Sequence, residues 1–224
     1  MSPEHPCPYL PGRQSRSEAY LADGLTGAMY EGLMALGFRR SGRVVYRPVC
    51  RACCACQQLR VPVDRFRPTR SMRRVWRANH DVTVVVGPPE CKPNRAQLFR
   101  RYLDHQHDSA MSRTMEALRE FLYDSPIQTL EFAYYASDKL LAVSIADVCP
   151  NGLSSVYVFF EPDESKRSLG TYSALWEIDY CRRHRLAYYY LGFYVANCAT
   201  MSYKARFRPN EVLVAPGRWA MFRE

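Results

Sequence analysis

The stretch that most constrains the fold of this chain runs from residue 129 to residue 195, where the spacing of apolar residues changes in a set order. Apolar and polar residues first alternate in segments separated by short turns: residues 129–136, 140–148 and 154–160. A period of two is typical of strands, so these segments predict an antiparallel meander. A glycine turn at 168–171, a helical pattern over 172–185 and a strand over 186–195 follow. This order predicts an α+β core whose last strand is reached through a helical crossover.

The remaining patterns predict smaller elements around this core. Residues 17–36 read as a helix, with Ser17 as the N-cap and Gly37 as the stop. Residues 38–48 alternate like a hairpin. Further elements are expected in this order: a strand over 59–63, a strand over 82–86, a helix over 95–108 and a helix over 113–123.

Positive charge is concentrated in the first third of the chain. Residues 1–77 hold 14 Lys and Arg against 5 Asp and Glu, whereas residues 78–224 hold 17 of each, so the first third supplies the whole net charge of +9. A basic region beside a neutral one favours a polyanionic partner, most simply a nucleic acid; a solvated basic face is the alternative. We therefore expect a basic N-terminal module over residues 1–77 and a second domain over residues 78–224.

Two segments combine cations with aromatic rings. Six arginines lie close together between residues 65 and 77, and Phe66 and Trp76 lie between them. Guanidinium groups bind phosphates bidentately and rings accept bases, so this segment is the best candidate for contacts to a phosphate backbone. The second segment, residues 191–209, leads from a strand-like run into Met201-Ser-Tyr-Lys-Ala-Arg-Phe-Arg-Pro209. Its composition suits a conjugated ligand that carries phosphate.

The sequence offers no membrane segment. No apolar run approaches the roughly 20 residues needed to cross a bilayer. The first residues lack the apolar region of a signal peptide. We expect a soluble cytoplasmic protein without a membrane partner.

The cysteines are clustered near the N-terminus. Cys50, Cys53, Cys54 and Cys56 fall within seven residues, and Cys7 stands in an irregular opening segment that needs an anchor. Spacings of two residues let neighbouring sulfurs converge on one ion, which predicts a zinc site or an iron-sulfur cluster. Reduced and redox-sensitive thiols without a metal are the alternative. The nine cysteines are an odd number, and we expect no disulfides in the cytosol.

Short motifs extend over nearly the whole chain. In the first half they are Cys7-Pro-Tyr-Leu10, Gly37-Phe-Arg-Arg-Ser-Gly42, Tyr46-x-Pro48, Cys50-x-x-Cys53-x-x-Cys56 and Arg70-Ser-x-Arg-Arg74. In the second half they are Ser154-Ser-Val-Tyr157, Pro162-Asp163, Ser168-Leu-Gly-Thr-Tyr-Ser-Ala-Leu175, Leu191-Gly192, Cys198, Met201, Tyr203-Lys204 and Phe207-x-Pro209. Together they resemble the aminoacyl-tRNA-protein transferases, and the compact length and cysteine spacing resemble the bacterial branch. Glu161, Val195, Ala199 and the extra Cys54 depart from the family pattern.

This resemblance implies an N-acyltransferase fold, similar to that of the acetyl-CoA-dependent acetyltransferases. It also implies transfer of Leu from Leu-tRNA to an N-terminal Asp or Glu, which marks the acceptor protein for degradation. Such an enzyme needs aminoacyl-tRNA and acceptor proteins as partners, but neither DNA nor a catalytic cofactor. The alternatives are an Arg donor, an acetyl-CoA-dependent acetyltransferase, and a non-catalytic tRNA- or RNA-binding module with structural zinc.

The chemistry of this transfer suggests roles for particular residues. Asp147 is the candidate general base, with a turn-capping aspartate as the alternative. Tyr157 and Tyr203 are candidates to orient the ester or to stabilise its tetrahedral oxygen, although each could be a core ring. We assign tRNA contacts to these residues: Arg70, Arg73, Arg74, the turn at Leu169 and Gly170, Lys204, Arg206 and Arg208. Arg39, Arg40 and Arg47 are candidates for binding the acceptor's carboxylate, or for a general contact to tRNA. The metal ligands would be Cys7, Cys50, Cys53 and Cys56.

Overall fold

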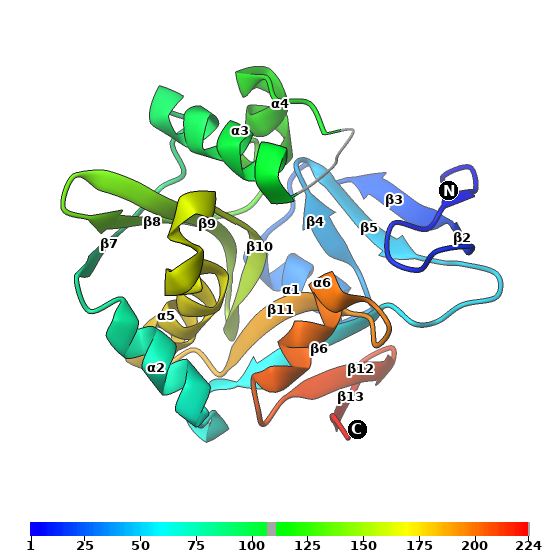
Figure 1. Ribbon diagram of the computed structural model, residues 1–224. Coiled ribbons are helices and arrows are strands. Elements are labelled where there is room, and N and C mark those ends of the chain that lie inside the picture. The colour runs from blue at the N-terminus through cyan, green and yellow to red at the C-terminus, as the bar shows by residue number, and fades with distance from the viewer. Residues whose placement is uncertain (107–110, 224) are drawn as a thin grey trace.

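An eight-stranded, mostly antiparallel sheet forms the centre of the protein (Figure 1). The computed structural model describes residues 1–106 and 111–223. Strand order across the large sheet is β13-β12-β6-β11-β10-β9-β8-β7. Its strands are β6 (Gln57–Pro62), β7 (Val82–Gly87), β8 (Thr129–Ala136), β9 (Lys139–Cys149), β10 (Gly152–Phe160), β11 (Tyr188–Tyr194), β12 (Glu211–Ala215) and β13 (Arg218–Met221). β10 and β11 are a parallel pair, whereas the other neighbours run antiparallel.

The predicted meander and crossover are confirmed. β8, β9 and β10 pair in sequence, and the turn between β8 and β9 uses Ser137 at φ 49°. After the short helix η3 (Pro162–Arg167), α5 (Leu169–Arg183) carries the chain to β11. The α+β fold class is therefore confirmed as a large, mostly antiparallel sheet flanked by helices.

Helices cover both faces of the large sheet. α5 and α2 (Arg70–Ala78) pack on one face, where Ala142 and Ala146 of β9 point. The other face takes α1 (Gly27–Ala35), α3 (Pro93–Gln106), α4 (Met115–Leu118) and the π-helical turn η2 (Arg119–Tyr123). On that face Val143 and Ile145 belong to the core. The alternation along β9 thus reflects burial on both faces.

The helix predicted over residues 17–36 is present only in its second half, and its predicted start at Ser17 is wrong. Residues Ser17–Leu21 form β3, which pairs with β5 (Val44–Pro48), and β5 pairs with β4 (Arg39–Ser41) in a separate three-stranded sheet. The helix in this region, α1, begins only after Thr26, whose side chain accepts a hydrogen bond from the Met29 amide. Gly24, at φ 71°, lies between the strand and the helix in a conformation that a helix does not contain. The hairpin over 38–48 is confirmed.

Residues from the first third complete the large sheet. β6, which confirms the strand expected at 59–63, lies between β11 and β12. A division of the chain at residue 77 would therefore separate β6 from both of its neighbours in the sheet. The smaller elements of the chain are β1 (His5–Pro6), β2 (Gln14–Ser15), η1 (Val63–Arg65), α6 (Ala199–Ser202) and η4 (Tyr203–Arg206).

The helices expected around residues 95–123 are present with changed bounds. α3 ends at Gln106, and the last two residues of the prediction, His107 and Asp108, lie outside the described residues. The second helix is divided into α4 and the π-helical η2. Within the part of the chain that the structure describes, no helix combines the length and the apolar character needed to cross a membrane.

Candidate active site

The two parallel strands separate soon after they meet. β10 and β11 pair only where residues 152–154 face residues 188–190. Just beyond, β10 shifts register against β9 between Ser155 and Tyr157, and β11 shifts against β6 between Tyr190 and Gly192. Strands that diverge leave backbone donors and acceptors without partners from the sheet, and such groups can bind a ligand. We call the region between residues 155–160 and 191–194 the wedge.

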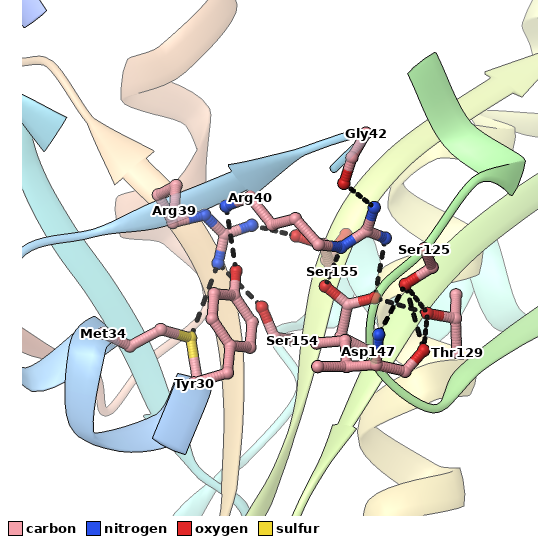
Figure 2. Close-up of polar contacts among 11 residues, drawn as sticks. Tyr30, Met34, Arg39, Arg40, Gly42, Ser125, Thr129, Asp147, Ser154 and Ser155 are labelled. Carbon is pink, nitrogen blue, oxygen red and sulfur yellow. Dashed lines mark hydrogen bonds and ion pairs between the residues drawn. The ribbon is translucent and has the colours of Figure 1, made fainter. Parts of the chain in front are cut away.

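Arg39 closes the narrow end of the wedge (Figure 2). Its Nη1 donates to Ser154 Oγ at 2.8 Å, and its Nη2 donates to the carbonyl oxygen of Ser155. On the β11 side, a Cβ built on Gly192 would lie 3.4 Å from Nη2, and Gly192 also has φ 83°. The left-handed backbone favours glycine there, and the guanidinium lies at van der Waals distance from where a side chain would begin. Arg39 is only 5% exposed.

Arg40 of β4 and Asp147 of β9 form a buried ion pair between the two sheets. Arg40 Nε and Nη2 donate to the two carboxylate oxygens of Asp147 at 2.8 and 2.7 Å, and both side chains have 0% exposure. Thr129 Oγ1 adds a hydrogen bond of 2.8 Å to the same carboxylate (Figure 2). Both carboxylate oxygens are thus engaged by protein groups. This position does not support the catalytic role expected for Asp147 or the substrate contact expected for Arg40; both side chains join β4 to β8 and β9.

Arg47 is engaged within the three-stranded sheet. Its Nε donates to Glu18 at 2.7 Å, its Nη1 donates to the carbonyl of Leu36 at 3.1 Å, and its guanidinium lies 4.7 Å from the Phe38 ring centroid. The structure therefore separates the three arginines predicted to bind the acceptor. Arg39 is the one whose guanidinium bonds to β10 and lies beside Gly192 of β11.

Three tyrosines gather beside the wedge. Tyr157 of β10 hydrogen-bonds with Tyr102 of α3, and their ring centroids are 6.3 Å apart. Burial raises the pKa of Tyr102 to about 12, and the nearby Tyr203 raises it further. Burial also raises the pKa values of Tyr157 and Tyr203. The structure thus brings the predicted Tyr157 and Tyr203 together around Tyr102, a residue of the helix expected over 95–108 to which the sequence assigned no role in the site.

Lys204 differs from the other cations of its segment. It is half-buried, and its Nζ donates to the carbonyl of Phe193 at 2.7 Å and contacts Met201 Sδ at 3.7 Å. Burial, followed by the nearby Arg39 guanidinium, lowers the pKa of Lys204 to about 7. Arg206 and Arg208 are exposed. The three cations of this segment expected to contact tRNA are therefore divided between one half-buried amine bonded to β11 and two exposed arginines.

The C-terminal end of α2, not its exposed arginines, lies beside the start of α5. Arg70, Arg73 and Arg74 project into solvent, and α2 packs against α5. Asn79, at the end of α2, donates to the carbonyl of Arg167, two residues before α5 begins. Leu169 is buried in the core, so the α5 turn can offer a ligand its backbone and not the leucine side chain.

The N-terminal cysteines surround one small cavity. A space of about 40 Å³ is lined by residues that include Cys7, Cys50, Cys53, Cys54 and Cys56. Burial raises the pKa of Cys56 to about 12, and the neighbouring thiols add to the shift. Among the described residues, however, no three His, Cys, Asp or Glu side chains stand in a group that could hold a metal ion. The donor set suits zinc or an iron-sulfur cluster, but its arrangement does not, so ligation by Cys7, Cys50, Cys53 and Cys56 stays a prediction.

Glu177 of α5 is a buried carboxyl group that sequence reasoning missed. It accepts hydrogen bonds from Ser144 Oγ at 2.5 Å and from the Tyr189 hydroxyl at 2.9 Å. Burial raises its pKa to about 7. A lone glutamate between Leu175 and Ile178 on a helix was the available signal. Glu177 also contributes to the raised pKa of Tyr203, so the network reaches the wedge from the α5 side.

Comparison with known proteins identifies the family of this chain. A family model described as "Arginine-tRNA-protein transferase, N terminus" matches residues 5–74, and one described as "Arginine-tRNA-protein transferase, C terminus" matches residues 94–214. Two curated relatives carry the name aspartate/glutamate leucyltransferase. The one from Nitrosococcus oceani is 42% identical over 231 residues, covering 100% of this chain and 95% of the relative. The one from Hahella chejuensis is 39% identical over 217 residues, covering 95% and 92%.

A solved structure shares the fold at low sequence identity. The C-terminal DUF2156 domain of a protein from Agrobacterium fabrum aligns with a TM-score of 0.52 and 13% identity, covering 82% of this chain and 59% of that chain. Likeness at this identity extends to the fold alone. The family models and the curated relatives confirm the resemblance seen in the sequence motifs, and the chain belongs to the arginine-tRNA-protein transferase family.

Proposed function

We propose that this protein transfers leucine from leucyl-tRNA to the N-terminal Asp or Glu of other proteins and thereby marks them for degradation. The observation that carries the proposal is the relationship to proteins named aspartate/glutamate leucyltransferase, at about two-fifths identity over nearly the full length of both chains. The two matching family models are named for arginine, so arginyl transfer is the second candidate.

The reaction depends mainly on the positions of the two substrates. An aminoacyl ester is already activated, so transfer needs neither ATP nor a covalent intermediate on the enzyme. The nucleophile is an α-amino group with an ordinary pKa of about 8, which leaves roughly a tenth of it neutral at pH 7. The amine attacks the ester carbonyl, and the 3'-hydroxyl of the tRNA leaves. A site that fixes the two substrates and stabilises the oxyanion is sufficient.

The wedge offers groups for this work. Its tyrosines carry their protons at neutral pH, as phenols ordinarily do, and burial raises the pKa values of Tyr102, Tyr157 and Tyr203 further. A protonated phenol can donate a hydrogen bond to the negative oxygen of the tetrahedral intermediate. We assign this role to Tyr157 and Tyr203, with Tyr102 as the group that positions Tyr157.

The surface beside the wedge suits the tRNA. Arg70, Arg73 and Arg74 form an exposed basic face on α2, and α2 packs on the helix that starts at Leu169 and Gly170. Arginine donors and the N-terminal amides of a helix both favour phosphate. Arg206 and Arg208 extend the basic surface from the segment that follows β11.

One assay tests the proposal. The protein is incubated with leucyl-tRNA or arginyl-tRNA that carries a labelled amino acid, and with peptides that begin with Asp, Glu, Lys or Ala. We expect labelled leucine on the Asp and Glu peptides. Labelled arginine on those peptides would favour the second candidate, and tRNA binding without label on any peptide would leave a non-catalytic module.

A further inference from the structure

We propose that Arg39 and Lys204 together form the receptor for the side-chain carboxylate of the acceptor's first residue. This inference rests on the proposed transfer to N-terminal Asp or Glu and names the groups that select those residues. It moves Lys204 from the tRNA side of the site to the acceptor side, and it leaves Arg40 and Arg47 as structural residues.

Two consecutive residues of β11 hold the two cations together. The Arg39 guanidinium lies against the backbone of Gly192, and Lys204 Nζ bonds to the carbonyl of Phe193. The influence of Arg39 on Lys204 shows that the charges are within electrostatic reach of each other. The pair therefore stands at one place, on the β11 side of the narrow end of the wedge.

Neither cation has a protein carboxylate as a partner in the described part of the chain. Arg39 donates to Met34 Sδ, Ser154 Oγ and the carbonyl of Ser155, and Lys204 donates to the Phe193 carbonyl and Met201 Sδ. By contrast, the buried Arg40 and Arg95 each pair with a carboxylate. A buried guanidinium beside a half-buried amine, with no counter-ion among the described residues, is unfavourable when both are charged, so the arrangement fits a site that receives an anion from outside.

A small carboxylate suits this position better than a tRNA phosphate. Arg39 is 5% exposed, whereas the arginines proposed for tRNA project into solvent. The carboxylate of Asp or Glu is also only a few bonds from the α-amine that attacks the ester. Its receptor must consequently adjoin the reacting centre, and Lys204 directly follows Tyr203 in η4.

The test measures peptide binding without tRNA, so it does not depend on turnover. Two fluorescent peptides are compared that differ only at the first residue, Asp against Asn, which removes the charge at nearly constant shape. Their affinities are measured by anisotropy for the wild-type protein, Lys204→Met, Lys204→Arg and Arg39→Gln. Lys92→Met, a change at an exposed lysine whose ion-pair partner is Glu90, is the matched control.

We expect wild-type protein to bind the Asp peptide more tightly than the Asn peptide by about 10- to 100-fold, the range for a hydrogen bond to a charged group. Lys204→Met should remove most of this preference, Lys204→Arg should keep much of it, and Lys92→Met should keep all of it. Arg39→Gln provides an independent second variant if Lys204→Met does not fold.

Equal binding of the two peptides by wild-type protein would overturn the inference. So would an unchanged Asp preference in folded Lys204→Met together with a raised KM for leucyl-tRNA, because that result places Lys204 on phosphate. If Lys204→Met lowered only kcat and kept the preference for the Asp peptide, Lys204 would be a proton acceptor. That result would also contradict the proposal. Failure of the proposed leucine transfer would be recognised separately from failure of the carboxylate receptor. Wild-type protein would then transfer no leucine, whatever its preference between the Asp and Asn peptides.

Discussion

The phenol groups around the wedge are protonated at neutral pH, and burial extends this to higher pH. The pKa of Tyr102 is raised to about 12, chiefly by burial, and those of Tyr157 and Tyr203 are raised as well. At the scale of single residues, these hydroxyls are therefore hydrogen-bond donors throughout the neutral pH range. Asp147, by contrast, is held by Arg40 and Thr129, and Lys204 has no acidic partner among the described residues. The site thus consists mainly of donors and cations, as a reaction that forms an oxyanion requires.

Tyr157→Phe removes one donor and leaves the ring in place. We expect kcat for leucine transfer to fall about 10- to 100-fold, because the lost hydrogen bond is strongest to the charged oxygen of the transition state. The KM values for peptide and leucyl-tRNA should change little. Tyr188→Phe, at the start of β11, serves as the matched control and should keep wild-type kcat. Single-turnover kinetics give the comparison, and a Tyr157→Phe enzyme with unchanged kcat would remove Tyr157 from the chemistry.

Among the elements, the Arg40–Asp147 pair joins the three-stranded sheet to the large sheet. Replacing Arg40 with Met leaves a buried carboxylate without its counter-ion, which should destabilise the protein by about 3–5 kcal/mol. Changing Asp147 to Leu in the same chain removes the stranded charge, so the double variant should recover part of this loss. Urea unfolding measures both. If folded Asp147→Asn lost catalysis while its stability stayed unchanged, the residue would be catalytic after all.

Helix α2 provides a prediction about tRNA at the same scale. Arg70, Arg73 and Arg74 are exposed, so their replacement by Gln should leave the fold intact. Each arginine that contacts a phosphate contributes about one unit to the slope of log affinity against log salt. The triple variant should bind leucyl-tRNA more weakly and with a slope smaller by about three, as read by filter binding at several salt concentrations. An unchanged slope would place the tRNA elsewhere.

At the scale of the whole molecule, the buried Glu177 couples stability to pH. Its pKa is raised from 4.5 to about 7 in the folded protein, mainly by burial, so folding favours the protonated form. The resulting stability is fully present below pH 4.5 and is lost as the pH rises towards 7 and above. A shift of this size corresponds to about 3 kcal/mol. Urea unfolding of wild-type protein from pH 5 to pH 8 should show this decline, and Glu177→Gln should flatten it; an equal decline in the variant would exclude Glu177 as its source.

The sequence predicted the parts of the fold that local patterns determine. The period of two and the turn residues identified β8, β9 and β10, and the glycine turn and helical spacing identified α5 and β11. The same reasoning failed at residues 17–36, because Tyr20, Leu21 and Leu25 have helix-like spacing although Tyr20 and Leu21 are exposed on a strand. Local patterns contain no information about partners: Arg40 and Asp147 are 107 residues apart, and Arg39 and Ser154 are 115 apart.

The wedge therefore could be predicted only in outline. Tyr157, Tyr203 and Arg39 were recognised from their chemistry and from family motifs, and the structure brings them to the same pair of diverging strands. The sequence could not assign separate roles to the cations, because these roles depend on burial. Lys204 is half-buried, whereas Arg206 and Arg208 are exposed. Tyr102 joins the site through packing of α3 on β10, which no motif announces.

Transfer of labelled leucine from leucyl-tRNA to a peptide that begins with Asp is the decisive measurement of the activity assigned to this protein. We predict label at the α-amine of the Asp and Glu peptides, no label on the Lys and Ala peptides, and a strong reduction by Tyr157→Phe. Absence of label on the acidic peptides, in the presence of intact leucyl-tRNA and folded protein, would contradict the account.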